Sequence, residues 1–328
     1  SVEELFRNEW KSSAEIYLPG GNLPKSGDFF KNKKMAETYL KIISEAELKS
    51  RDKKEQIQQA RKIWSQGFIA EEIENYCKNN EIMDTTETKH GGLLRGSDLA
   101  NWSATIEKPS SYDYKNFTVC KTGPWGQGPT FLQQLALLKH FDLDSLDELS
   151  PEFVHLVIES TKLAFADREA FYGDTNFNKV PMKTLLSDEY NNERKNLISE
   201  NASMEVRPGK IEGYEGKVVV RPKGTTPESF SKFDIGEPTV ARFDEPNPNS
   251  LGETKGDTTH FDIIDKWGNM IAGTPSGGWL QSSPVIPKLG FCLSNRGQMF
   301  WLDKNSPACI GPKRRPRTTL SPSLALKD

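Results

Sequence analysis

The sequence predicts an α+β fold that combines amphipathic helices with short strands. Apolar residues recur at three- and four-residue spacing in residues 1–80 and again in residues 150–172, which is typical of helices. Residues 104–122 alternate more like strands, and a hairpin sequence is centred near residue 267. The chain has 328 residues, enough to bury a core as one large domain or two smaller ones.

The first 140 residues divide into helices, a strand and loops. Residues 35–43 and 60–76 predict helices, and Leu-Pro-Gly-Gly at 18–21 predicts a turn. Residues 118–121 predict a short strand. A loop rich in glycine and proline follows at 122–129 and leads into a predicted helix at 130–140.

The best-marked helix begins after Ser150. Ser150 suits the N-cap, Pro151 suits the first turn, and Glu152 lies near the positive end of the helix dipole. Gly173 supplies a stop. His155 and Glu159 lie one turn apart, but without an HExxH pattern or a third ligand they predict a surface pair rather than a metal site.

Residues 200–257 are unusually polar. Gly, Pro, Lys, Glu and Ser dominate this stretch, so it cannot bury enough apolar surface to offset the entropy lost on ordering. We therefore expect a flexible linker that ends at Thr258.

A β-hairpin is expected after this linker, with strands at 258–264 and 270–276. A three-residue loop at 266–268 ends in a glycine, which readily takes the left-handed conformation that this turn needs. The resulting register places Ser276 opposite Thr258, where Cβ atoms lie about 4.5–5.5 Å apart. A slip of one residue would move Ser276 to the other face of the hairpin.

Thr258 is the candidate nucleophile. A cut before it would leave one residue with both a hydroxyl and a free α-amino group, which is a known nucleophile–base arrangement. Ser276, across the predicted hairpin, is placed to hydrogen-bond the hydroxyl. The alternative is an ordinary hairpin edge whose threonines simply suit a strand.

These residues resemble those of a known family. The segment that starts at Asp257, Asp-Thr-Thr-His-Phe, and continues to Asp-Lys-Trp-Gly-Asn at 265–269 is similar to the start of the small subunit of γ-glutamyltranspeptidases, which are N-terminal-nucleophile hydrolases. Further similar segments span nearly the whole chain: Gly-Gly-Leu-Leu at 91–94, Gln127-Gly128, Thr-Lys-Leu-Ala-Phe-Ala-Asp-Arg at 161–168, Tyr-Gly-Asp at 172–174, Val180-Pro181, and Arg-Pro-Arg-Thr-Thr-Leu-Ser-Pro at 315–322.

The resemblance implies an αββα sandwich made as a precursor that cuts itself between Asp257 and Thr258. Residues 1–257 would then belong to the large subunit and residues 258–328 to the start of the small subunit, within one intertwined domain. The two subunits from one precursor would form a heterodimer, or a dimer of such heterodimers.

The resemblance also implies roles for individual residues. In the family, the freed threonine attacks an amide substrate with its α-amine as general base, and water or an acceptor amine resolves the acyl-enzyme. Ser276 matches the hydroxyl residue that hydrogen-bonds the nucleophile, and Thr259 would stabilise the N-terminal strand. Thr318 and Thr319 match the hydroxyl residues that contact the substrate carboxylate; the alternative is that they are ordinary strand or loop threonines.

Two departures from the family bear on the substrate. The family has an asparagine two positions after the residue that matches Ser276, whereas this sequence has Gly278 there. The family's acidic residues that hold the γ-glutamyl amino group fall here on Arg296, Gln298 and Met299, and a buried ammonium needs a partner. Arg296 would favour an acidic substrate or pair internally, and the pattern points to the divergent, acylase-like branch. The candidate substrate-binding residues are Gly277, Gly278, Arg296, Gln298, Thr318 and Thr319.

Two segments of the family have no counterpart in this sequence. One contains an arginine that grips the substrate carboxylate, and the other is a Gly-Ser-Pro-Gly-Gly-like loop whose amides form the oxyanion hole. We expect both ends of the chain to continue in a longer protein. Because one oxyanion-hole donor is often worth a factor of about 10²–10³ in rate, this polypeptide alone is expected to be inactive.

Composition disfavours several other classes. The net charge is −3 and the basic residues are scattered, so no nucleic-acid partner is expected, and the dense run at 313–317 predicts a solvated loop. No stretch approaches the roughly 18 apolar residues of a membrane span. No cofactor or metal is expected, since ligand spacing and nucleotide fingerprints are missing. The four cysteines lack CxxC spacing and favour a reducing compartment, hence a cytoplasmic location.

Three functions remain open at this point. The first is a self-processing N-terminal-threonine amidohydrolase or acyltransferase that acts on a small-molecule amide. The second is a true γ-glutamyltranspeptidase, a hydrolase of glutathione or related γ-glutamyl compounds. The third is a non-catalytic homologue that serves as a binding or structural protein.

Overall fold

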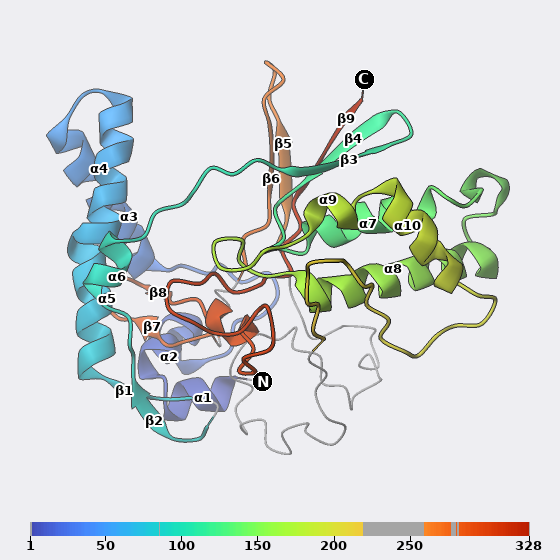
Figure 1. The fold of residues 1–328 in the computed structure, drawn as a ribbon. Helices are drawn as coiled ribbons and strands as arrows, with labels where there is room; N and C mark the ends of the chain where they lie inside the picture. Colours follow the sequence, from blue (N-terminus) through green and yellow to red (C-terminus); the bar gives the residue numbers. More distant parts are fainter. Residues whose placement is uncertain (1, 85, 219–258, 277–279, 281, 328) are drawn as a thin grey trace. The chain divides into compact units, whose positions relative to one another are not determined.

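The computed structural model describes residues 2–84, 86–218, 259–276, 280 and 282–327, which belong to two compact units (Figure 1). The described residues of unit 1 lie within Ser1–Thr105 and Gly277–Asn295. Those of unit 2 lie within Ile106–Lys223, Thr258–Ser276 and Arg296–Asp328. Each unit therefore contains residues from both sides of the predicted cleavage point.

Unit 1 consists of helices and two small antiparallel hairpins. The turn predicted at 18–21 is present as a 3₁₀ turn, Pro19–Gly21, and the helix predicted at 60–76 is two helices that meet at Gly67. The elements are α1 Glu3–Asn8, α2 Lys11–Tyr17, α3 Lys33–Lys49, α4 Lys53–Gln66, α5 Phe68–Asn79, α6 Gly96–Ala100, β1 Glu81–Met83, β2 Lys89–Gly91, β7 Val285–Ile286 and β8 Phe291–Cys292.

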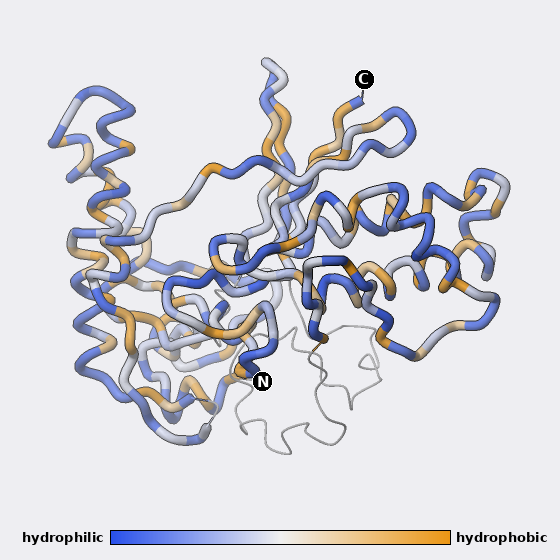
Figure 2. Tube along the Cα trace, in the orientation of Figure 1, coloured by the Kyte–Doolittle hydropathy of each residue, from blue (hydrophilic) through white to orange (hydrophobic). Residues whose placement is uncertain are grey.

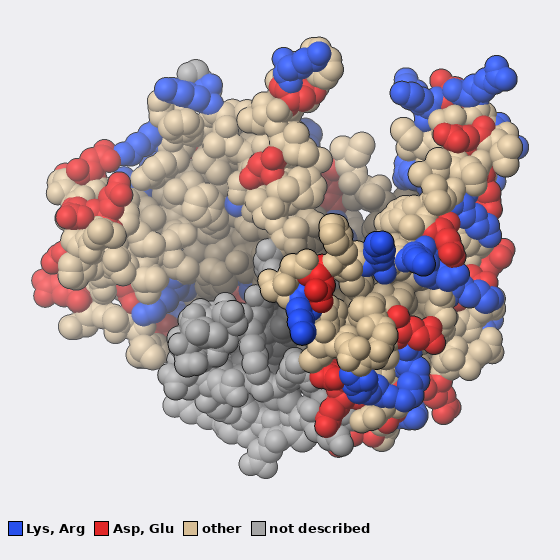
Figure 3. Space-filling model, turned by 180° about the vertical axis from the view of Figure 1, so that it is seen from behind, with Lys and Arg blue, Asp and Glu red and all other residues tan. Residues whose placement is uncertain are grey.

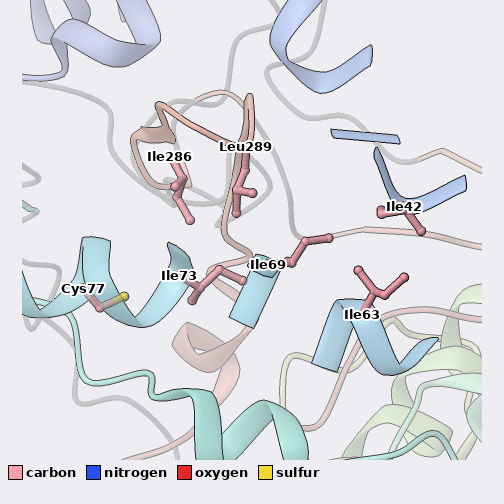
Figure 4. Close-up of a cluster of buried hydrophobic side chains, with 7 residues drawn as sticks. All are labelled: Ile42, Ile63, Ile69, Ile73, Cys77, Ile286 and Leu289. Carbon is pink, nitrogen blue, oxygen red and sulfur yellow. The ribbon is translucent and has the colours of Figure 1, made fainter. Parts of the chain in front are cut away.

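The core of unit 1 joins α3, α4 and α5 to the segment around β7. Ile286 and Leu289 are 1% and 0% exposed, and they pack on helical isoleucines (Figure 4). Complete burial of such a side chain is worth about 1.5–3 kcal/mol. The Thr38 hydroxyl donates to the Leu289 carbonyl at 2.9 Å, so these two buried polar groups beside the cluster satisfy each other. The buried members are Ile42, Ile63, Ile69, Ile73, Cys77, Ile286 and Leu289.

Unit 2 contains a three-stranded antiparallel sheet in the order β3–β4–β9, with Val119 between Tyr112 and Ala325. The predicted strand at 118–121 is confirmed as part of β4, and the helix predicted at 130–140 begins two residues earlier. The elements are β3 Ser110–Tyr114, β4 Phe117–Lys121, β9 Ser323–Lys327, α7 Gly128–Leu138, α8 Pro151–Phe171, α9 Met182–Leu185 and α10 Asp188–Arg194 (Figure 1).

Helix α8 begins as predicted and ends differently. The Ser150 hydroxyl accepts a hydrogen bond from the Phe153 amide at 3.1 Å, so the predicted N-cap is confirmed. The helix ends because Tyr172, fully buried, takes an extended conformation. Gly173 is not a left-handed cap. It is needed because a Cβ there would lie 2.4 Å from the Pro307 carbonyl oxygen.

The hairpin is present with the predicted register. β5 Phe261–Ile264 pairs with β6 Met270–Gly273, Phe261 lies opposite Gly273, and Gly268 has a φ of 83°. The strands are shorter at their open end than predicted, in keeping with Pro275, which has no N–H for a ladder. Strand β6 lies beside β9, and hydrophobic stretches run along both strands of the hairpin (Figures 1 and 2).

Within the part of the chain that the structure describes, no helix is long and apolar enough to cross a membrane. The four cysteines, all of them described, form no disulfide. Acidic and basic side chains are intermixed on the face seen in Figure 3 rather than gathered by sign.

Candidate active site

The open end of the hairpin is held by a histidine. His260 Nδ1 lies 2.7 Å from the Thr274 hydroxyl, directly across the hairpin, and its Nε2 lies 3.0 Å from Asp262 Oδ2. This pair continues the β5–β6 register by one residue on each strand. Thr259, the next residue toward the predicted cleavage point, is exposed, and Ser276 on the other strand is half-buried.

Several predicted site residues lie outside the described residues: Asp257, Thr258, Gly277 and Gly278. Counting two residues further along the observed register pairs Thr258 with Ser276. That pairing remains a prediction.

The two predicted substrate-contacting threonines have different surroundings. Thr318 is 6% exposed, its amide donates to the Trp125 carbonyl at 2.9 Å, and its hydroxyl has no hydrogen-bond partner among the described residues. Thr319 is exposed. The Gln127 amide donates to the Leu320 carbonyl at 3.4 Å, so the predicted glycine-rich loop at 122–129 lies directly against this segment.

Two arginines of the basic run at 313–317 are held by carboxylates rather than left in solvent, contrary to the sequence prediction, while Lys313 is exposed. Arg317 is 5% exposed, donates to the Arg168 carbonyl at 3.1 Å and pairs with Glu169. Arg315 is fixed by Asp174, through its amide at 2.8 Å and its Nη2 at 3.1 Å. Charge runs are usually solvated, and here the buried carboxylate of Asp174 and the half-buried carboxylate of Glu169, both from a distant segment, override that tendency.

These contacts shift several pKa values. Burial alone would raise the pKa of Asp174, but hydrogen bonds from Arg315 and the Asn176 amide hold it below the ordinary carboxyl value. Burial, with the neighbouring Arg317, lowers the pKa of Arg168 to about 10. Burial also lowers the pKa of Lys121, whose ammonium donates to the Ser321 carbonyl at 2.8 Å.

The segment matched to the family's acidic residues forms a 3₁₀ turn, Arg296–Met299. Arg296 is half-buried in it and Gln298 is exposed. The turn itself contains no carboxylate. The next acidic residue along the chain, Asp303, accepts hydrogen bonds from the Asn305 amide at 2.8 Å and side chain at 3.0 Å.

Sequence reasoning missed two buried carboxylates on α8. Glu159 was expected on the surface, but its side chain is 1% exposed and pairs with Arg207 at 2.8 Å and Lys162 at 2.6 Å. Asp167 is fully buried and accepts from Gln133, Tyr190, Arg194 and the Gly209 amide. His155 contacts the Ser199 carbonyl at 2.7 Å, and among the described residues no His, Cys, Asp and Glu cluster could hold a metal ion.

Comparison with known proteins identifies related chains. The Gamma-glutamyltranspeptidase family model matches residues 1–328. The glutathione hydrolase proenzyme of Bacillus subtilis (strain 168) is 28% identical over 328 residues, which cover 99% of this chain and 48% of that protein. The chain thus spans about half the length of this relative. The Acylase ACY 1 proenzyme of Pseudomonas sp. (strain SE83) is 28% identical over 241 residues, covering 73% of this chain and 36% of that protein.

A solved structure agrees with these relatives. The chain in the structure of LmbA2991T421A is 45% identical and superposes with a TM-score of 0.83. The match covers 100% of the present chain and 52% of the chain in that structure. The match over every residue of the chain, with this structural similarity, places the chain in the γ-glutamyltranspeptidase family, with the α+β fold, an αββα sandwich, of the N-terminal-nucleophile hydrolases.

Proposed function

We propose that the protein is a self-processing amidohydrolase or acyltransferase whose nucleophile is Thr258. The observation that carries this proposal is the His260–Thr274 contact, because it extends the hairpin register to within two residues of Thr258 and Ser276. Two relatives in the same family, a glutathione hydrolase proenzyme and an acylase proenzyme, support the same chemistry.

Processing begins within the precursor. The Thr258 hydroxyl oxygen bonds to the carbonyl carbon of Asp257 while the Asp257–Thr258 C–N bond breaks, and the α-nitrogen takes up a proton. Water then adds to the resulting ester, releasing the Asp257 carboxyl group and restoring the hydroxyl. Ser276 orients that hydroxyl from across the hairpin, and Thr259 keeps the new N-terminus in the strand.

The new α-amine of Thr258 then serves as the general base for catalysis. It accepts the hydroxyl proton as the oxygen attacks the substrate carbonyl, and it returns a proton to the departing amine. Water or an acceptor amine attacks the acyl-enzyme and regenerates the hydroxyl. In this scheme the Thr318 and Thr319 hydroxyls donate to a carboxylate on the acyl group.

The acyl group we propose carries a carboxylate but no ammonium. Arg296 and Gln298 stand where the family has acidic residues, and Gly278 stands where it has an asparagine, so an ammonium would be buried without a counter-charge. Gly277 and Gly278 offer the substrate main-chain groups alone. Glutaryl amides, which are γ-glutamyl amides without the ammonium, fit this description. The B. subtilis relative instead favours the second candidate, a true γ-glutamyltranspeptidase acting on glutathione.

Mass spectrometry of the purified full-length protein tests the nucleophile before any substrate is chosen. A fragment that begins at Thr258 is expected from the wild type, and only the uncut precursor from Thr258→Ala. Thr258→Ser is the matched control, because it retains a hydroxyl and should still be cut. Cleavage at the same bond in Thr258→Ala would contradict the proposal, and an uncut wild type would favour the non-catalytic homologue.

Chromogenic anilides then test the substrate. The processed protein should hydrolyse glutaryl-p-nitroanilide with a kcat/KM at least about tenfold above that for γ-glutamyl-p-nitroanilide, since tenfold corresponds to only 1.4 kcal/mol. Preference for the γ-glutamyl compound would favour the true transpeptidase.

Partners and location follow the same proposal. The two processed fragments form a heterodimer, alone or as a dimer of heterodimers. The relatives named as proenzymes support cleavage of a precursor into two fragments. A cytoplasmic location remains the prediction from cysteine usage.

A further inference from the structure

The segment that carries Thr318 and Thr319 is fixed by an ion pair that lies three residues before Thr318. Asp174 accepts from the Arg315 amide at 2.8 Å, from its Nη2 at 3.1 Å and from its Nε at 3.3 Å. One carboxylate therefore holds both the main chain and the side chain of Arg315. The Asp174 side chain is only 1% exposed, so solvent competes little for these bonds.

The remaining faces of the Arg315 guanidinium are also occupied. Its Nη1 donates to Glu107, and its central carbon lies 5.0 Å from the centre of the Trp125 ring. Trp125 Nε1 donates to the same Glu107 carboxylate at 2.9 Å. The guanidinium thus links Asp174 to the loop that supplies the Trp125 carbonyl to the Thr318 amide.

The threonines themselves are held by main-chain contacts. The Thr318 amide bonds to Trp125, and the Leu320 carbonyl accepts from the Gln127 amide. The Thr318 hydroxyl is buried and has no hydrogen-bond partner in the described part of the chain, which is an uncommon and costly state for a polar group. The position of this hydroxyl is consequently set by the backbone on either side of it.

We propose that Asp174 and Arg315 are positioning residues that set the place of the Thr318 and Thr319 hydroxyls for the carboxylate of the acyl group. This inference rests on the proposed function. Asp174 and Arg315 act through the threonines and touch no reacting atom. Their loss should therefore weaken substrate binding more than it slows the chemical steps, and it should leave self-cleavage intact.

The first experiment compares Asp174→Asn, Arg315→Met and the wild type with glutaryl-p-nitroanilide. Arg315→Met keeps an apolar chain against Trp125 and removes the charge. We expect KM to rise about 10- to 100-fold with kcat changed less than about threefold, since small displacements of binding groups cost up to about 10². Arg315→Lys should recover part of the loss. Lys313→Gln, an exposed residue of the same loop, is the control and should match the wild type.

A second comparison separates positioning from general destabilisation. If Asp174 acts through the hydroxyls, Asp174→Asn should add little to the KM of a Thr318→Val/Thr319→Val protein. An unchanged KM in the single variants, or full additivity with the threonine variants, would overturn the proposal. The proposal would also be overturned if self-cleavage and kcat fell in parallel with the rise in KM.

Hydrogen exchange tests the positioning even if neither anilide is turned over. Asp174→Asn should lower protection of residues 315–321 while α7 keeps its protection. Unchanged protection of residues 315–321 would overturn the inference. A wild type that cuts itself yet hydrolyses neither anilide would instead refute the proposed acyl group.

Discussion

Asp174 bears its charge where its side chain is almost closed to solvent. Hydrogen bonds from Arg315 outweigh the burial that would otherwise raise the pKa of this carboxyl group, and the pKa is lowered in the folded protein. A carboxylate with a lowered folded pKa adds stability above its unfolded pKa and loses that contribution as the pH falls through the folded value. The Asp174–Arg315 pair is therefore intact at neutral pH and fails only in acid.

The lowered pKa of Asp174 predicts how the effect of an Asp174 substitution on stability depends on pH. Asp174→Asn should lower the free energy of unfolding by about 1.5–3 kcal/mol between pH 6 and 8, as expected for hydrogen bonds to a charged group. Below about pH 4 the difference from the wild type should begin to shrink, because the carboxyl of the unfolded chain is then protonated, and it should disappear as the pH falls through the lower folded pKa. Urea unfolding at several pH values measures it. A difference that stays constant down to pH 3 would show that the charge of Asp174 contributes nothing.

Helix α8 ties residues 194–209 to the rest of unit 2. Asp167 receives only donors, from Gln133 at 2.6 Å, Tyr190 at 2.9 Å, Arg194 at 3.3 Å and the Gly209 amide at 2.6 Å. Burial raises the pKa of Asp167, whereas the Arg194 guanidinium and the donated hydrogen bonds lower it, and we expect the carboxyl beside this guanidinium to be ionised at neutral pH. Both the Asp167 and the Arg194 side chains are nearly inaccessible.

Asp167→Asn should consequently be one of the most destabilising substitutions in unit 2. It leaves the Arg194 guanidinium buried without a counter-charge, which typically costs about 3–5 kcal/mol. Denaturant unfolding, with hydrogen exchange of residues 194–210, measures both the loss and its location. Glu148→Gln, at an exposed position before α8, should stay within about 0.5 kcal/mol of the wild type. A loss of the same small size for Asp167→Asn would mean that its carboxyl is already neutral.

The sequence predicted those elements whose causes are local. The hairpin register follows from Gly268 and the three-residue loop, and the start of α8 follows from the Ser150 cap, so both were predicted correctly. The burial of Glu159 on α8 was not predicted, because its charge is paired with Arg207, which lies 48 residues away in the sequence. Arg315 was misread for the same reason: its partner Asp174 lies 141 residues away. Of the proposed site, Thr258 is predicted only from turn geometry and family resemblance, and it lies outside the described residues.

The residues after the predicted cleavage point contribute to both units. Ile286 and Leu289 fill the core of unit 1, while β9 pairs with β4 in unit 2. After a cut before Thr258, the two fragments should therefore remain bound without any covalent link. They should co-elute on native size-exclusion chromatography and separate only in strong denaturant.

Leu289→Ala tests this attachment, because removal of a fully buried leucine typically costs about 2–5 kcal/mol. The processed variant should release its fragments at a lower denaturant concentration than the wild type. Leu302→Ala, at a side chain that is 84% exposed, is the control. Separation of the wild-type fragments in plain buffer would show that these contacts are too weak to join them.

The hairpin loop also limits how this protein can change in length. Residues 266–268 lie eight to ten positions after Thr258, and a three-residue loop here gives the register that predicts Ser276 opposite Thr258. If the strands pair again around a loop of three residues, deletion of one loop residue would bring Gly277, and insertion of one would bring Pro275, to the place predicted for Ser276, and neither has a hydroxyl. Homologues that tolerate length variation elsewhere on the surface should therefore keep a constant spacing between the proposed nucleophile and the serine predicted to face it.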